Sequence, residues 1–151
     1  EHNPADTDES RDTKLMPLVR STAGRSGSGG VSAASAIIFV IDGGGSTILA
    51  GIKGDIYIPF NFVVTSAKLL ADQTGSIIVD IWKDTYANYP PTVADKITGS
   101  TPPTIAAATK STDATLSGWT TTIPADSILR FNVNNVTSLQ RVTVILNGVR
   151  S

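Results

Sequence analysis

The sequence predicts an all-β domain, and composition and spacing both lead to this class. Thr, Ser, Gly, Val and Ile are abundant whereas Met occurs once and Glu is scarce, a mixture that favours strands over helices. Roughly seven to nine short strands recur between turn residues, at the spacing of an antiparallel β-sandwich. No internal repeat is found, which disfavours propellers and solenoids. The 151 residues suffice for one such domain and are too few for two ordinary ones.

Residues 1–30 differ from the rest and predict an extended N-terminal arm. They are polar, carry charges of both signs, and end in a Gly/Ser-rich stretch at 23–30 that is typical of a flexible linker. A segment of this composition cannot bury enough apolar surface to order itself, so we expect another chain to order it. An arm that lies back along its own domain is the alternative. The residues that would be buried are Leu15, Met16, Pro17, Leu18 and Val19.

The β-sandwich domain is expected over residues 31–151. Its first strand, within 31–41, is apolar on both faces and is therefore predicted to be central in a sheet. The next, within 48–59, alternates between a core face and a wet face that includes Lys53, Asp55 and Tyr57. A third strand is predicted at 62–70.

A turn at 72–75 precedes the clearest strand, centred on residues 77–82. One of its faces is aliphatic, and the other mixes an isoleucine, Asp80 and Trp82. An aromatic and proline-rich loop follows at 86–91.

The second half of the domain begins with a weak pattern. Residues 92–111 predict a long loop that contains one short helical turn at 93–97. Periodicity returns at 114–123, and strands are expected at 128–133 and 142–146. The large side chains expected to anchor the core are Trp82, Trp119 and Phe131.

The sequence offers little for catalysis, cofactors or metals. The one histidine, His2, lies in the arm, so neither a Ser-His-Asp triad nor a histidine metal site can be built on the domain. Cysteine is absent, which excludes disulfides and thiolate chemistry. Asp80 and Asp84 share a face of a strand, but roughly 13 Å of rise separates them, too far for a glycosidase pair. We expect no enzyme, no cofactor and no metal; calcium in an Asp- and Asn-rich loop is the fairest alternative.

Charge and hydropathy also exclude several partners. A formal net charge of −1 gives no field that favours nucleic acid or an acidic membrane surface. The longest apolar run, 36–41, is too short to span a bilayer, so no membrane insertion is expected. A carbohydrate remains conceivable, because Tyr86 and Tyr89 could stack on sugar rings; for Trp82 and Trp119 a core position is favoured.

Several stretches resemble a domain of bacteriophage virion proteins, found at the C-terminus of tail-fibre, head-fibre and decoration components. They are ADQTGS at 71–76, VDIWKDTYANYPP at 79–91, GWTT at 118–121 and ILRFNV at 128–133. Together with 48–59 the resemblance covers most of 37–146 but not the arm. It implies a jelly-roll-like β-sandwich without enzymatic activity, displayed in several copies on a virion and often trimeric. It carries over no catalytic residue.

The leading hypothesis is therefore a non-enzymatic phage structural protein located in the virion, as a fibre, tail or capsid decoration component. Its arm would bind other virion proteins or other copies of the chain, most simply in a homotrimer. The alternative is a glycan-binding module for host-cell attachment that uses Tyr86, Tyr89 and the loop 90–110. A glycoside hydrolase built on an aspartate pair is the least favoured hypothesis.

Overall fold

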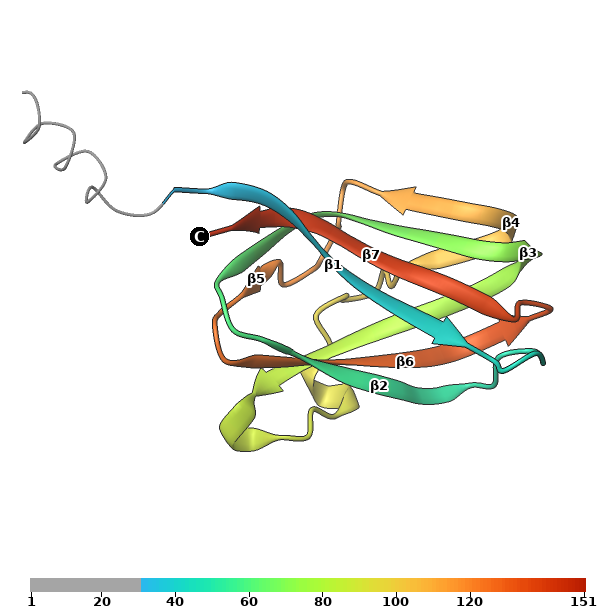
Figure 1. Cartoon of the computed structure of the whole chain (residues 1–151), viewed down its shortest axis with the longest axis horizontal. Coiled ribbons are helices and arrows are strands. Elements are labelled where there is room, and N and C mark those ends of the chain that lie inside the picture. Colours follow the sequence, from blue (N-terminus) through green and yellow to red (C-terminus); the bar gives the residue numbers. More distant parts are fainter. Residues whose placement is uncertain (1–30) are drawn as a thin grey trace, which may run out of the picture. The chain divides into compact units, whose positions relative to one another are not determined.

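Strands dominate the part of the chain that this computed structural model describes, residues 31–151 (Figure 1). The predicted arm, including Leu15 to Val19, lies outside the described residues. No helix in residues 31–151 is long and apolar enough to cross a membrane. The elements, in chain order, are β1 (Ala33–Asp42), β2 (Gly51–Ile58), β3 (Phe62–Thr85), the 3-10 turns η1 (Tyr86–Asn88) and η2 (Val93–Asp95), β4 (Thr104–Asp113), β5 (Thr122–Ile123), β6 (Ser127–Thr137) and β7 (Arg141–Arg150).

The long strand β3 forms a corner that divides the sheet into two layers. Its first half pairs antiparallel with β7 as far as Ala71, and its second half pairs antiparallel with β6 from Ser76 onward. The chain bends between these residues without leaving the strand, so the turn predicted at 72–75 and the separate strands predicted on either side of it are wrong: β3 is one continuous strand. β4 follows the same corner, since its start pairs with the second half of β3 and its end with the first half.

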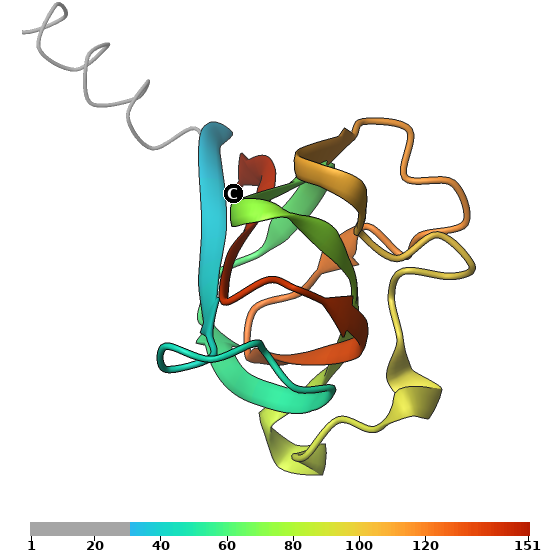
Figure 2. The same cartoon turned by 90° about the vertical axis from the view of Figure 1, so that its right-hand side faces the viewer.

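Each layer consists of antiparallel strands, in the order β1, β7, first half of β3 for one layer and β2, β6, second half of β3 for the other (Figure 1). The predicted antiparallel β-sandwich with a jelly-roll-like strand arrangement is thereby confirmed. Figure 2, turned by 90°, shows the curled sheet with β1 on one side and the segments that follow β3 and β4 on the opposite side.

Alternation along each strand places one set of side chains between the layers. Phe131 of β6 is fully buried there and stacks on Phe39 of β1, with ring centroids 4.3 Å apart. Close packing also requires glycine at one position of β7: a Cβ on Gly148 would lie 2.1 Å from the carbonyl oxygen of Val63. A side chain at this position would force the two strands apart.

Two further predictions about strands are wrong. The first strand is not central: β1 pairs with β7 alone, at the end of the sheet order, and one of its apolar faces is also exposed. Apolar periodicity cannot distinguish a central strand from an edge strand that has an exposed apolar face. In addition, residues 104–111 are not loop but belong to β4. This Thr/Ala-rich segment has no clear alternation to predict a strand, and it forms one because it pairs with β3.

Other local predictions are closer to the structure. The helical turn expected at 93–97 is η2, which begins at Thr92 with a reciprocal capping box between Thr92 and Asp95. By contrast, the renewed periodicity predicted at 114–123 does not form a strand over that stretch, which is loop except for the two-residue strand β5.

Candidate functional site

All three tyrosines of the chain gather at the end of the sandwich where β2 ends and β6 begins. Tyr57 comes from β2, Tyr86 from η1, and Tyr89 from the residue that ends η1. Their side chains remain half exposed or more, at 51%, 66% and 50%. We refer to these tyrosines, with Asp55, Asp126 and Arg130, as the tyrosine cluster.

One half of the cluster forms a hollow of about 310 Å³ lined by Tyr57, Tyr86 and Asp126. The two rings meet edge to face, with centroids 6.3 Å apart and planes at 85°. The Tyr57 hydroxyl donates to Asp126 Oδ1 at 2.9 Å. The hollow therefore combines two aromatic walls with a carboxylate.

Backbone hydrogen bonds fix the relative positions of these side chains. The Tyr86 N–H donates to the Asp126 carbonyl at 3.0 Å, and the Asp126 N–H donates to the Ile58 carbonyl at 2.8 Å. Asp126 adopts a left-handed conformation with φ of 71°, which Asp tolerates better than most residues. The η1 segment and the turn before β6 are thus held together at this end of the sandwich.

The other half of the cluster is a network around Arg130. Its guanidinium holds Asp55 in a bidentate pair, with Nε to Oδ1 at 2.7 Å and Nη2 to Oδ2 at 2.9 Å. The Tyr89 hydroxyl donates to the same Asp55 Oδ2 at 2.7 Å, and the guanidinium lies 5.5 Å from the Tyr89 ring centroid. The positive charge of Arg130 is therefore matched within the cluster.

These contacts shift the titration of the groups involved. Hydrogen bonding from Arg130 lowers the pKa of Asp55, and the Asp55 carboxylate raises the pKa of Arg130 in return. The hydrogen bond to Asp126 raises the pKa of Tyr57, and that to Asp55 raises the pKa of Tyr89. Tyr57 and Tyr89 are therefore neutral hydroxyls, rather than candidate bases, at physiological pH.

Asp80 lies outside the cluster and fastens the loop that follows η2. It is 1% exposed and accepts hydrogen bonds from Trp82 Nε1 at 3.1 Å and Thr98 Oγ1 at 2.5 Å. Lys96 Nζ lies 3.7 Å from its Oδ2. Asp84, considered above as its glycosidase partner, instead accepts from the N–H of Thr85, which caps η1, and from the side chain of Asn88, the last residue of η1. Both carboxylates thus hold segments of the fold in place.

The predicted core anchors occupy three different environments. Phe131 lies at the centre of the core, as described above. Trp82 is buried on the opposite face of β3 from the core, where its indole reaches Asp80. Trp119 packs against the rim of the core and donates from Nε1 to the Thr101 carbonyl at 3.0 Å.

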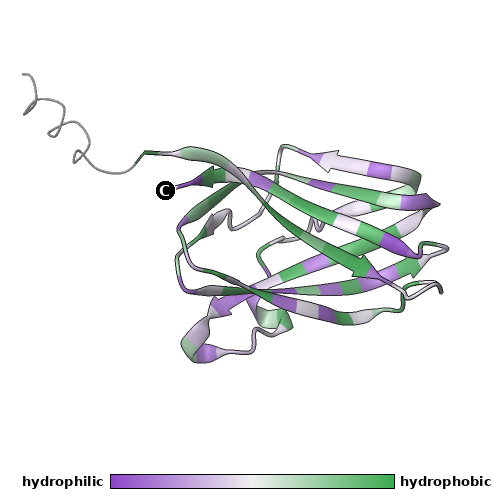
Figure 3. Ribbon diagram, in the orientation of Figure 1, coloured by the Kyte–Doolittle hydropathy of each residue, from purple (hydrophilic) through white to green (hydrophobic). Residues whose placement is uncertain are grey.

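A second surface of interest is the outward side of the layer that contains β1. Ile38 and Val40 of β1 are 58% and 51% exposed, and Figure 3 shows β1 as an almost continuous hydrophobic ribbon. The strand register places Ile145 of β7 beside Ile38, and Leu70 of β3 across Thr143 from Val40. We refer to this surface as the apolar face; the register also places Lys68, Thr143 and Asn147 on it. Its apolar members are Ala34, Ala36, Ile38, Val40, Val63, Leu70, Ile145 and Val149.

β1 also differs from the other edge strands of the described chain. All 10 of its residues pair with β7 without a register shift, and Ala33 to Ile41 contains no charge. The edge strand β2 carries Lys53 and Asp55 and a bulge, and β4 carries Lys110 and register shifts. β1 therefore lacks the features by which an edge strand usually avoids pairing with another chain.

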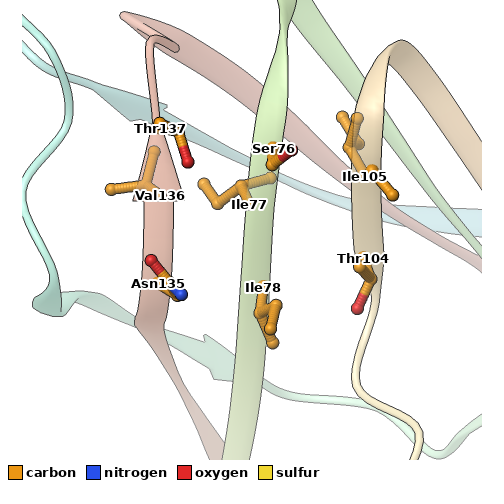
Figure 4. Close-up of a pocket in the computed structure, with 9 residues that line it drawn as sticks. Ser76, Ile77, Ile78, Thr104, Ile105, Asn135, Val136 and Thr137 are labelled. Atoms are coloured by element: carbon orange, nitrogen blue, oxygen red, sulfur yellow. The ribbon is translucent and has the colours of Figure 1, made fainter.

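A groove of about 210 Å³ crosses β6, β3 and β4 near the corner (Figure 4). Its lining residues are aliphatic, hydroxyl or amide side chains, including Ile78, Thr104 and Asn135. None of the lining residues titrates, so the groove offers no acid–base chemistry. Within residues 31–151 no group of three or more His, Cys, Asp or Glu side chains is placed to hold a metal.

The structure brings Tyr86 and Tyr89 together with residues that the sequence analysis did not select. Asp55 and Arg130 are 75 positions apart in the chain, and Tyr57 and Asp126 are 69 apart. The available signal was the alternation of 48–59, which puts Asp55 and Tyr57 on the wet face of one strand. It could not indicate which residues of β6 lie beside them.

Comparisons with known proteins add little to this geometry. No protein-family model matches the chain, and no curated protein matches it. Among solved structures, one similar chain comes from "Structure of infectious bursal disease virus Gx strain", at 13% sequence identity and a TM-score of 0.33. The match covers 80% of this chain and 40% of that chain. We draw no functional argument from a likeness of this size.

Proposed function

We propose that this protein is a non-enzymatic structural component of a bacteriophage virion, in which the β-sandwich is displayed on the particle and residues 1–30 fasten it. The resemblance of 71–76, 79–91, 118–121 and 128–133 to phage virion domains motivates the class of protein. The observation that carries the proposal is the combination of an unprotected edge strand, β1, with the exposed apolar face beside it.

The physical argument concerns what an isolated copy would expose. A long, regular, uncharged edge strand presents unpaired N–H and C=O groups to any other strand. Contiguous exposed apolar surface on a soluble protein typically marks an interaction site. Both features on one surface favour burial against a neighbour, and we take the neighbours to be further copies of the chain, in a homotrimer, together with other virion proteins.

Light scattering of the full chain tests the role of this surface. We expect a mass three times that of one chain, and we expect Ile38→Lys to shift it toward the monomer, because a buried charge opposes association. Val93→Lys is the matched control: Val93 of η2 is 59% exposed, against 58% for Ile38, but lies outside the apolar face. A monomeric wild-type chain, or an unchanged mass for Ile38→Lys, would refute self-association through β1.

A chain that begins at Val31 separates the arm from the sandwich. If it has the same mass as the full chain, the sandwich carries its own symmetry and the arm is left to bind other virion proteins. If it is monomeric while the full chain associates, the arm is the assembly element. Deletion of residues 1–20 should also prevent incorporation into particles, and unchanged incorporation would refute the docking role of the arm.

Glycan binding for host-cell attachment is a second candidate function, which could coexist with the first. The specific observation in its favour is the tyrosine cluster, where exposed rings and carboxylates adjoin at one end of the sandwich. Aromatic faces suit the apolar side of a sugar ring, and carboxylates accept hydrogen bonds from its hydroxyls. A glycan array with the full chain tests this function; a blank array would count against it.

A further inference from the structure

We propose that the hollow between Tyr57, Tyr86 and Asp126 binds one uncharged pyranose unit, with Asp126 accepting hydrogen bonds from its hydroxyl groups. This inference rests on the second candidate function and narrows it to a subsite and a class of sugar. It moves the centre of the site from the pair Tyr86 and Tyr89 to the pair Tyr57 and Tyr86.

The shape of the hollow supports a single sugar ring. Its volume of about 310 Å³ lies near the lower end of the range for small-molecule sites. Tyr57 and Tyr86 form two walls close to a right angle. One wall can stack on the C–H face of a pyranose while the other contacts its edge, and both rings are exposed enough to do so.

The polar group of the hollow is placed and held before any ligand arrives. Asp126 is fixed by its own backbone N–H and carbonyl and by the hydroxyl of Tyr57. That hydroxyl uses one acceptor position on Oδ1, and a carboxylate has about four such positions. The remaining positions can accept sugar hydroxyls without a rearrangement of the loop, which reduces the entropic cost of binding.

The charges around the hollow select against acidic sugars. Asp126 lines it, and Asp84 lies beside η1 at the Thr85 cap. The cation of the cluster, Arg130, is held bidentately by Asp55 and contacts Tyr89 rather than the Tyr57 side. A sialic acid or a uronate would therefore bring a carboxylate toward Asp126 without gaining a cation from the residues that line the hollow, whereas a neutral hexose avoids this repulsion.

The test is an array of neutral, sialylated and uronate-bearing glycans probed with the full-length chain, followed by titration with the best neutral ligand. We expect binding to neutral glycans and at least a tenfold weaker affinity for Tyr86→Ala. Tyr86→Phe, which keeps the ring, should stay within about threefold of wild type. Asp126→Ala should weaken binding, whereas Val93→Ala, outside the cluster, should not change it. Circular dichroism of each variant verifies that the β-sandwich persists.

The outcomes distinguish the inference from the function on which it rests. Binding confined to acidic glycans, or neutral binding that Tyr86→Ala leaves unchanged, would overturn the proposed subsite while glycan binding itself stands. An array without any bound glycan would remove both. Neutral binding lost in Tyr86→Ala and kept in Tyr86→Phe supports both.

Discussion

The edge strands on the two sides of the sandwich, β4 and β1, differ in how far the chain itself covers or protects them. On the β4 side, β4, β5 and loop segments line the free edge of β3, with Val79 N–H donating to the Pro103 carbonyl and Val64 N–H to the Thr121 carbonyl, both at 2.9 Å. β4 itself is irregular and adopts a positive φ of 49° at Ala107. On the opposite side β1 is regular, carries no charge before its last residue, Asp42, and pairs on one side alone within the described chain. One side is closed by the chain itself, and the other is suited to closure by a neighbour.

The loops that close the β4 side support one another. Thr120 N–H donates to the Ile97 carbonyl at 2.8 Å, and Thr101 Oγ1 donates to the Ser117 carbonyl at 2.6 Å. Gly99 packs so closely on Gly118 that a Cβ there would lie 2.5 Å from its carbonyl oxygen. The difference between the sides shows that the regularity of an edge strand, and not only its composition, decides whether it can pair with another chain. The irregular backbone of β4 disfavours such pairing, whereas the regular, apolar β1 permits it.

The largest expected effect separates the two faces of β1 itself. Ile37→Ala should lower the free energy of unfolding by about 2–5 kcal/mol, because it leaves a cavity in the core. Ile38→Ala, one residue along, should change it by less than about 0.5 kcal/mol in dilute solution, because its side chain is exposed. Urea titration at low protein concentration measures both. Equal losses for the two variants would contradict the exposure of the Ile38 face of β1.

A smaller loss of stability is expected when Asp80, which holds the loop after η2 on the β4 side, is replaced. Asp80→Ala leaves the Trp82 indole N–H and the Thr98 hydroxyl without their buried acceptor, and should lower stability by about 1–3 kcal/mol. Asp80→Asn keeps an acceptor oxygen and should cost less. Hydrogen exchange should show faster exchange at the Ile97 and Thr120 amides while β1 and β7 stay protected. Unchanged protection at Ile97 would mean that Asp80 does not hold the loop.

The smallest effect concerns Asp55, a charge that protects edge strand β2. Because hydrogen bonding from Arg130 lowers the pKa of Asp55 in the folded state, its stabilisation is present above the ordinary carboxyl pKa of about 4 and is lost as pH falls through the folded value. Stability should therefore decrease below about pH 4. Asp55→Asn should show a shallower decrease over that range in thermal melts. An identical pH dependence in the variant would rule out this contribution.

Much of the fold was predictable because local alternation survives folding. The aliphatic face of β3 around residues 77–82 and the inward residues of β6 follow the period of two that the sequence displays. In β2 the period holds only after the bulge between Ile52 and Gly54, which leaves Ile52 exposed. The change of direction at 72–75 was also predictable, from Asp, Gln, Thr and Gly in succession, although β3 continues through it as a strand rather than ending in a turn. Its role as the corner between layers was not, since that depends on β6 and β7, which come much later in the chain.

The sequence by itself determined the class of fold, an antiparallel β-sandwich, and the presence in its second half of two tyrosines flanking an irregular turn. Only the tertiary structure decided that β1 is an edge strand and that residues from 104 on form β4. It also brought Tyr86 and Tyr89 together with the residues Asp55, Tyr57, Asp126 and Arg130. The physical reason is that alternation records which side of a strand is apolar, whereas strand order and cross-strand neighbours arise from pairings between distant segments.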